Sequence, residues 1–504
     1  MRLKNTLMNL IAAWGGQLVL IFVKFFTRRF FTRYLDVVYL GIDGTFSTII
    51  STLSLAELGI GGAIAFSLYK PLANEDQETT KSLMAYYKHI YQVIGIIIGV
   101  LGLAIMPFLY QLSNDLPHIP YLRLIFFLYL CNTVLSYFCS YRTTLLNADQ
   151  KKYIYLTNHY VFYIIMNIVQ IVVLYVTKNF FVFISAQILF TISENLNIAR
   201  IAGKKYPLLK EKNVQPLHAE IKSMIWKNTK NMAIGRVGNI IIDSSDVLIL
   251  SKFLGTVTVG FYNNYQLIIS SIQAILTQFT DAMLPSIGNL YAQGNKERIV
   301  DIFYVSNFLN TWIYGWVSIC IINLIQPFVT IWVGEKYLLS LATVIILVLR
   351  LYIKGMRNIV NTYRTAFGLF KCERWKSVAE GILNIILSII FVYYLGMEGV
   401  FFGTVISALV VGIWPEVLEL FRDGFDLSQG RYYLRYMIYS IIWIIIGGGI
   451  YSICLQIHGG LFITFLIRAI ICIIIPNVIW YLIWRKSSEM KYLFEVGKGI
   501  LKRK

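Results

Sequence analysis

Four basic residues and one amide recur along a segment that is otherwise apolar. Arg350, Lys354, Arg357, Asn361 and Arg364 follow one another at intervals of four, three, four and three residues. On an α-helix this spacing places all five side chains on one face. A charge at the centre of a membrane helix costs about 2.5–3.5 kcal/mol, so the stripe must face water, protein or an anionic ligand. We call it the basic ladder and predict that it is functional.

A second polar stripe, Arg236, Asn239, Asp243 and Asp246, follows the spacing three, four, three in another apolar segment. Two interpretations are equally open. In a structural network, the arginine and the aspartates would neutralise neighbouring charges, including those of the basic ladder. In a functional site, Arg236 would line a cavity on the inner side, and Asp243 or Asp246 would carry a coupling ion.

Two further charges lie in apolar segments near the N-terminus. Lys24 shares a helical face with Gln17 and Arg28 and is the better candidate for a cavity, because Arg28 is closer to the outer end and can extend to the interface. Glu57 lies among glycines that permit close helix packing, so a structural role is slightly favoured over ion coupling. The five histidines lack the spacing of a metal site, and no metal is predicted.

The composition excludes an ordinary soluble protein. Of 504 residues, 57% are hydrophobic and only 14% are charged, whereas soluble domains carry about 25% charged residues. The formal net charge is +19, but the basic residues are concentrated in short connections between apolar segments. We interpret this charge as a topology signal rather than a nucleic-acid surface. The sequence predicts an all-α polytopic membrane protein.

Fourteen segments are long enough to cross a bilayer. They lie near residues 6–31, 40–69, 83–111, 119–146, 153–176, 180–201, 226–250, 257–291, 299–333, 338–367, 376–395, 398–421, 432–456 and 460–484. Most Lys and Arg residues of the connections fall on the side of the N-terminus, which places both termini in the cytoplasm. The connections on the opposite side are short, which disfavours a membrane-bound polymerase or ligase.

The chain has a predicted internal boundary. The connection 203–228 is long, basic and midway through the helix count, so we expect a first bundle at 1–202 and a second at 229–422. Two more helices would occupy 423–484, followed by a basic cytoplasmic tail at 485–504. Weak matches such as Gly41 with Gly260, at an offset of 219 residues, suggest that the two bundles are repeats in the same orientation.

No catalytic constellation is present. The sequence has no Walker loop, no dinucleotide-binding glycine motif and no convincing Ser/His/Asp arrangement. The sequence therefore predicts a transporter rather than an enzyme. Without an ATP site, transport must be passive or ion-coupled, with Na⁺ or H⁺ as the coupling ion and no other cofactor.

Residues 39–76, YLGIDGTFSTIISTLSLAELGIGGAIAFSLYKPLANED, resemble the second span and following loop of Wzx-type polysaccharide-unit flippases. These belong to the multidrug/oligosaccharidyl-lipid/polysaccharide (MOP) exporter superfamily. The passage DSSDVLILSKFLGTVTVGFYNNY, at 243–265, is similar to the second-half counterpart. The resemblance implies two six-helix bundles related by a pseudo-twofold axis in a V, as in MATE transporters, followed by two C-terminal helices.

The resemblance also implies a substrate: an oligosaccharide repeat unit on undecaprenyl pyrophosphate, moved to the outer leaflet by alternating access for capsule or exopolysaccharide synthesis. The protein would reside in the cytoplasmic membrane of a bacterium, among membrane lipids, with a polysaccharide polymerase and glycosyltransferases as partners. A pyrophosphate needs cationic partners. The candidates are Arg350, Lys354, Arg357, Arg364, Lys24 and Arg236, and the ion-coupling candidates are Asp243, Asp246 and Glu57.

Other functions remain open at this point. The same charge pattern suits a flippase for a peptidoglycan or teichoic-acid precursor. A multidrug cation antiporter shares the superfamily, but a cationic drug should prefer an acidic cavity. A non-transporting scaffold would be favoured if the basic ladder were buried in salt bridges with no cavity beside it.

Overall fold

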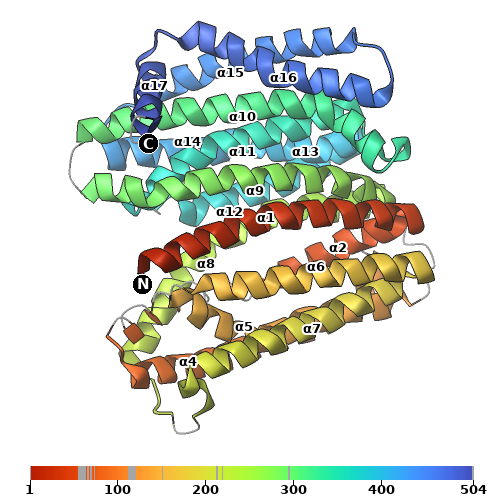
Figure 1. Ribbon diagram of the computed structural model, residues 1–504, viewed down its shortest axis with the longest axis vertical. Helices are drawn as coiled ribbons and strands as arrows, with labels where there is room; N and C mark the ends of the chain where they lie inside the picture. Colours follow the sequence, from red (N-terminus) through yellow and green to blue (C-terminus); the bar gives the residue numbers. More distant parts are fainter. Residues whose placement is uncertain are drawn as a thin grey trace. The chain divides into compact units, whose positions relative to one another are not determined.

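The fold is helical throughout the part of the chain that the structure describes (Figure 1). The structure is a computed structural model. It describes residues 2–54, 64, 67–68, 71–72, 74–111, 121–149, 151–211, 214–217, 219–292, 296–369 and 371–501. Within these ranges no strand occurs, which confirms the predicted all-α class.

Two compact units divide the chain, residues 1–263 and 264–504. The first unit contains α1 (Arg2–Tyr34), α2 (Val37–Leu53), α4 (Gln77–Ile105), η2 (Met106–Gln111), α5 (Leu122–Ala148), α6 (Lys152–Thr177), α7 (Phe180–Lys205), η3 (Pro207–Lys210), α8 (Ala219–Leu254) and the start of α9 (Thr256–Ala292). Within it, α1 packs on α6, and α5 packs on α4 and α7.

The second unit contains the rest of α9 and a larger set of helices. These are α10 (Lys296–Trp332), η4 (Glu335–Tyr337), α11 (Leu341–Phe367), α12 (Glu373–Leu395), α13 (Met397–Ser407), the π-helical turn η5 (Ala408–Gly412), α14 (Ile413–Glu419), the π-helical turn η6 (Leu420–Phe425), α15 (Gly430–Leu455), α16 (Leu461–Trp484) and α17 (Ser488–Leu501). Both α15 and α16 pack against α10, and Figure 1 shows α15 and α16 side by side.

Each of the fourteen predicted membrane segments coincides with a helix or a run of joined helices, as far as the structure describes it. Among the described residues, nine helices are long and apolar enough to span a bilayer, and a tenth does so if the bent helix α5 is one span. The other four segments are α2, which has 17 described residues, and α1, α8 and α11, which carry several charges. The count of fourteen spans stays a prediction.

The boundary between the compact units falls later than the predicted linker. Helix α8 lies in the first unit because it packs against α2. The predicted bundles at 1–202 and 229–422 rest on the basic connection and its place in the helix count, and they stay a prediction.

A reciprocal contact between the repeats lies within the first unit, where α2 meets the start of α9. A Cβ on Gly41 would lie 1.8 Å from the Thr256 carbonyl oxygen, and one on Gly260 would lie 2.6 Å from the Val37 carbonyl oxygen. The offset of 219 residues that relates Gly41 to Gly260 also relates Val37 to Thr256. Equivalent residues therefore exchange equivalent contacts, as expected around a twofold axis. This geometry supports the repeat inferred from the sequence.

Candidate functional site

The basic ladder lies on α11, whose opposite face is firmly packed. Ser340 caps the helix by accepting the Thr343 N–H at 3.0 Å. Gly355 lets α10 approach closely, because a Cβ there would lie 2.1 Å from the Tyr314 ring. Near the end of the helix, the Tyr363 ring lies 5.0 Å from that of Phe303, measured between centroids. These contacts fix the rotation of α11 and thus the direction of the ladder.

The first half of the ladder, Arg350 and Lys354, lies at the surface of the second unit. Arg350 is half-buried and Lys354 is exposed. A guanidinium and an ammonium one helical turn apart form a strip of positive charge that an anion can approach.

The second half begins with a buried cluster of four charges, which we call the charge cluster: Arg357, Lys376, Glu380 and Glu416. The Arg357 guanidinium donates to Glu380 Oε1 and Oε2 at 2.6 and 3.0 Å, and to Glu416 Oε1 and Oε2 at 2.8 and 3.0 Å. Lys376 donates to Glu416 and lies 3.7 Å from Glu380 Oε2. Two positive and two negative groups leave the cluster neutral.

Burial makes this neutrality necessary. The side chains of Lys376, Glu380 and Glu416 are 2% exposed and that of Arg357 is 15% exposed. Buried charges are tolerated only when they are paired and their hydrogen-bonding groups are satisfied. The cluster joins three elements, α11, α12 and α14, at one point.

The turn η5 provides room for the cluster. A Cβ on Gly412, the last residue of this π-helical turn, would lie 2.7 Å from Arg357 Nη1 and 2.8 Å from Glu380 Oε1. Only glycine leaves space for the two charged groups. Single π-helical turns inside α-helices frequently occur at functional sites.

Arg364 ends the ladder in a second neutral pair. Its Nε and Nη2 atoms donate to Glu419 Oε2 at 2.9 and 2.7 Å, and its Nη1 donates to Asn361 Oδ1 at 2.6 Å. Glu419 Oε1 in turn accepts the backbone N–H of Cys372 at 3.0 Å, which ties the connection after α11 to α14. Burial raises the pKa of the Cys372 thiol to about 12, so the thiol stays protonated at neutral pH.

Sequence reasoning did not identify the partners of the second half. Glu416 and Glu419 lie three residues apart in an apolar segment, and this spacing resembles that of the ladder closely enough to have served as a signal. Glu380 is a single acidic residue within the predicted segment 376–395. Binding of pyrophosphate by Arg357 and Arg364 stays a prediction, and their positions show carboxylates occupying most of their donors.

The remaining predicted residues belong to the first unit. Lys24 is exposed on α1, and on α8 Asp243 is exposed whereas Asp246 is completely buried. The side chain of Arg236, and Glu57 entirely, lie outside the described residues. In the described part of the chain, no three His, Cys, Asp or Glu side chains are grouped to hold a metal ion.

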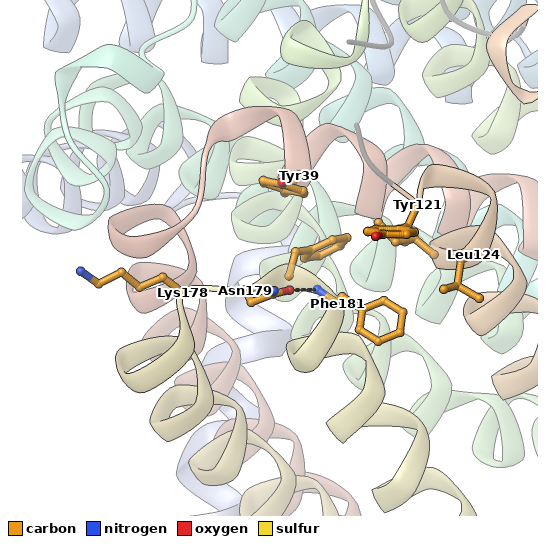
Figure 2. Close-up of a pocket in the computed structure, with 8 residues that line it drawn as sticks. Tyr39, Tyr121, Leu124, Lys178, Asn179 and Phe181 are labelled. Carbon is orange, nitrogen blue, oxygen red and sulfur yellow. Dashed lines mark hydrogen bonds between the residues drawn. The ribbon is translucent and has the colours of Figure 1, made fainter. Parts of the chain in front are cut away.

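A pocket of about 450 Å³ opens in the first unit, where α2, α5 and α7 begin (Figure 2). Half of its lining residues are aromatic and one is a cation; they comprise Tyr39, Tyr121, Leu124, Ile125, Lys178, Asn179, Phe180 and Phe181. Asn179 Oδ1 accepts the Phe181 N–H at 2.8 Å and caps α7. Among the predicted site residues whose side chains the structure describes, none lines this pocket.

The arrangement of helices is that of known transporters. The chain superposes on the inward closed conformation of the lipid II flippase MurJ with a TM-score of 0.69 and 14% identity, covering 94% of this chain and 99% of that one. The chain has the same fold as this protein. An inward-facing MATE multidrug resistance transporter of the MOP superfamily matches with a TM-score of 0.59 and 13% identity, over 81% of this chain and 98% of that one.

A third MOP structure, a transporter from Pyrococcus furiosus described by a binding pocket of reversed polarity, matches with a TM-score of 0.54 and 11% identity. It covers 83% of this chain and 96% of that one. Comparison of the sequence with protein-family models and with curated proteins finds no match. The MATE-like fold predicted from the sequence is thus confirmed by the similarity of the structures.

Proposed function

We propose that this protein is a flippase for a glycan linked to polyprenyl pyrophosphate. The favoured substrate is an oligosaccharide repeat unit on undecaprenyl pyrophosphate, moved from the inner to the outer leaflet by alternating access for capsule or exopolysaccharide synthesis. The observation that carries the proposal is the combination of a MOP fold with a strip of cations on α11. A lipid-linked pyrophosphate is an anion that such a strip can bind.

The two halves of the ladder have different roles in this proposal. Arg350 and Lys354 contact the pyrophosphate directly, because they lie at the surface of their unit. Arg357 and Arg364 position α11 through their carboxylate partners and add to binding only when a substrate phosphate displaces those partners. Lys24 and Arg236 supply cations from the first unit.

The membrane setting follows from the same proposal. The protein is a multi-pass protein of a bacterial cytoplasmic membrane with both termini inside, and it acts beside a polysaccharide polymerase and glycosyltransferases. Transport is coupled to Na⁺ or H⁺, with Asp243, Asp246 and Glu57 as candidates for the coupling site.

Two other substrates are supported less strongly. The likeness to a lipid II flippase favours a peptidoglycan precursor as the first alternative, and a teichoic-acid precursor has the same pyrophosphate chemistry. The likeness to MATE transporters favours a multidrug cation antiporter. The cationic strip opposes this second alternative, since it repels a cationic drug.

Complementation tests the proposal. The chain is expressed in cells that lack their own polysaccharide flippase, and export of the polymer is measured with the unchanged chain and with Arg350→Ala/Lys354→Ala. We expect the unchanged chain to restore export and the double variant to lose it at equal membrane abundance. Lys336→Ala/Lys371→Ala, which removes two exposed cations outside the ladder, is the matched control and should export normally.

The same cells separate the alternatives. Rescue of cells depleted of their lipid II flippase, without restored polymer export, would assign the peptidoglycan precursor instead. Normal export by the double ladder variant would remove Arg350 and Lys354 from the binding site.

A further inference from the structure

A second ionisable site lies between α6 and α7 in the first unit. His159 Nδ1 on α6 is 2.9 Å from Glu194 Oε1 on α7. The two side chains are 32% and 18% exposed, so the pair is largely enclosed but still reachable by water. Both helices are long and apolar enough to span a membrane. Placing an ionisable pair within membrane helices costs free energy, and such residues often mark ion pathways.

The composition of the surrounding helices makes this pair exceptional. His159 is the single histidine and Glu194 the single acidic residue on α1, α5, α6 and α7, and α6 packs against the other three. The other charged side chains described on these helices are all basic: Lys24, Arg28, Arg29 and Arg33 on α1, Arg123 and Arg142 on α5, Lys152 on α6, and Arg200, Lys204 and Lys205 on α7. The single acidic side chain of these four helices, Glu194, thus lies beside their single histidine, His159.

Tyrosines enclose the imidazole. The rings of Tyr155, Tyr160 and Tyr163 lie 6.0, 5.9 and 5.8 Å from that of His159, between centroids. Tyr160 is itself seated against α1, where a Cβ on Gly16 would lie 1.8 Å from its ring. This aromatic wall limits access of water and leaves Glu194 as the hydrogen-bond partner of the imidazole.

Neighbouring amides hold the two helices in register. Asn197 Nδ2 on α7 donates to Asn158 Oδ1 on α6 at 2.6 Å, directly beside the pair. Because one member lies on each helix, any change in the spacing of α6 and α7 alters the bond between imidazole and carboxylate. A proton shared by the two side chains therefore lies where a change in helix spacing is felt.

We propose that His159 and Glu194 form a proton-binding site that couples transport to a proton gradient, in addition to the candidates Asp243, Asp246 and Glu57; this rests on the proposed transport function. Histidine titrates near neutral pH, where a proton can be gained and lost in each cycle. The pair can hold one proton, as imidazolium beside carboxylate or as imidazole beside carboxylic acid. Uptake from one side of the membrane and release on the other makes or breaks no other bond and moves no electrons.

Proteoliposomes test the coupling. Translocation of an undecaprenyl-pyrophosphate-linked oligosaccharide is measured with and without an imposed pH gradient. We expect His159→Gln and Glu194→Gln to lose the dependence on the gradient but to retain gradient-independent translocation, and Glu194→Asp to keep part of the dependence. His89→Gln changes an exposed histidine on α4 and should behave like the unchanged protein. Undiminished gradient dependence in His159→Gln would overturn the proposal.

A measurement without substrate separates this site from the transport function. In the full-length protein labelled with ¹⁵N-histidine in lipid bilayers, the resonance that disappears in His159→Gln should change with pH, and Glu194→Gln should alter that change. A resonance that does not titrate between pH 5 and 8 would exclude proton binding there. If no variant translocates the substrate although His159 titrates as expected, the proposed substrate fails and the proton site stands.

Discussion

The two halves of the basic ladder share one face of α11 but differ in their surroundings. Arg350 and Lys354 lie at the surface of their unit, whereas Arg357 and Arg364 are enclosed with carboxylates from α12 and α14. A positive charge at the surface can bind and release a ligand, but a buried positive charge needs a permanent counter-ion. Equal spacing on a helix therefore does not imply an equal role.

The difference also concerns rigidity. The charge cluster and the pair of Arg364 with Glu419 fasten α11 to the elements around it, so the first half of the ladder projects from a fixed support. A binding site gains from such support because its side chains need not be ordered again when the ligand arrives. The structure thus shows carboxylate partners for the second half of the ladder, and binding of a ligand by the first half is our proposal.

Glu416→Gln tests whether the charge cluster supports the fold, and we expect it to have the largest effect. It leaves Arg357 and Lys376 with Glu380 alone, so the buried cluster gains a net positive charge. Removing one partner of a buried ion pair costs about 3–5 kcal/mol in the free energy of unfolding. We expect a large fall in thermal stability in detergent, with the exposed Glu335→Gln as the control. An unchanged melting temperature would mean that the cluster is not a structural support.

Gly412→Ala tests the space that the π-helical turn provides. The added methyl group would lie 2.7 Å from Arg357 Nη1, so the guanidinium or the turn must shift. Overpacking of this kind typically costs about 1–3 kcal/mol. The melting temperature should fall less than in Glu416→Gln. Gly448→Ala, where nothing lies within 4 Å of the added atom, is the matched control.

Arg350→Ala/Lys354→Ala tests the first half of the basic ladder. Surface substitutions usually change the free energy of unfolding by no more than about 0.5 kcal/mol, so the melting temperature should stay almost constant. Export should nevertheless be lost, because the strip no longer holds the anion. Export and stability falling together would place these residues with the second half of the ladder.

Glu489, on α17 after the last predicted span, supplies a pH test through its ion pair with Arg435. Burial opposes ionisation of Glu489, but a backbone N–H and the Arg435 guanidinium together hold the pKa of this carboxyl below its usual value. Its contribution is therefore complete above the unfolded-state pKa of about 4.3 and is lost as the pH falls through the lower folded-state value. We expect a small acid-induced fall in melting temperature.

Glu489→Gln should make the melting temperature less dependent on pH in that acidic range. Glu416→Gln in the charge cluster provides a contrast, because this substitution should lower the melting temperature at neutral pH as well. An identical acid response in Glu489→Gln and in the unchanged protein would show that this pair contributes nothing to stability.

Much of the helical layout could be predicted from the sequence, because apolar length and helical periodicity act locally. The ladder from Arg350 to Arg364 was placed on one face by spacing alone, and α11 has that face in the structure. The repeat was visible as Gly41 and Gly260, although only the structure revealed their reciprocal contact. The boundary between the two compact units, after residue 263, was not predicted, because it depends on how α8 packs.

The sequence by itself determined that the chain is a helical membrane protein with a stripe of cations, because burial of apolar residues and helix periodicity need only neighbours along the chain. Only the tertiary structure decided which cations are neutralised. Glu416 and Glu419 lie 59 and 55 positions from their arginine partners. Their approach depends on the packing of α14 against α11 and on the space at Gly412, and no local pattern specifies either.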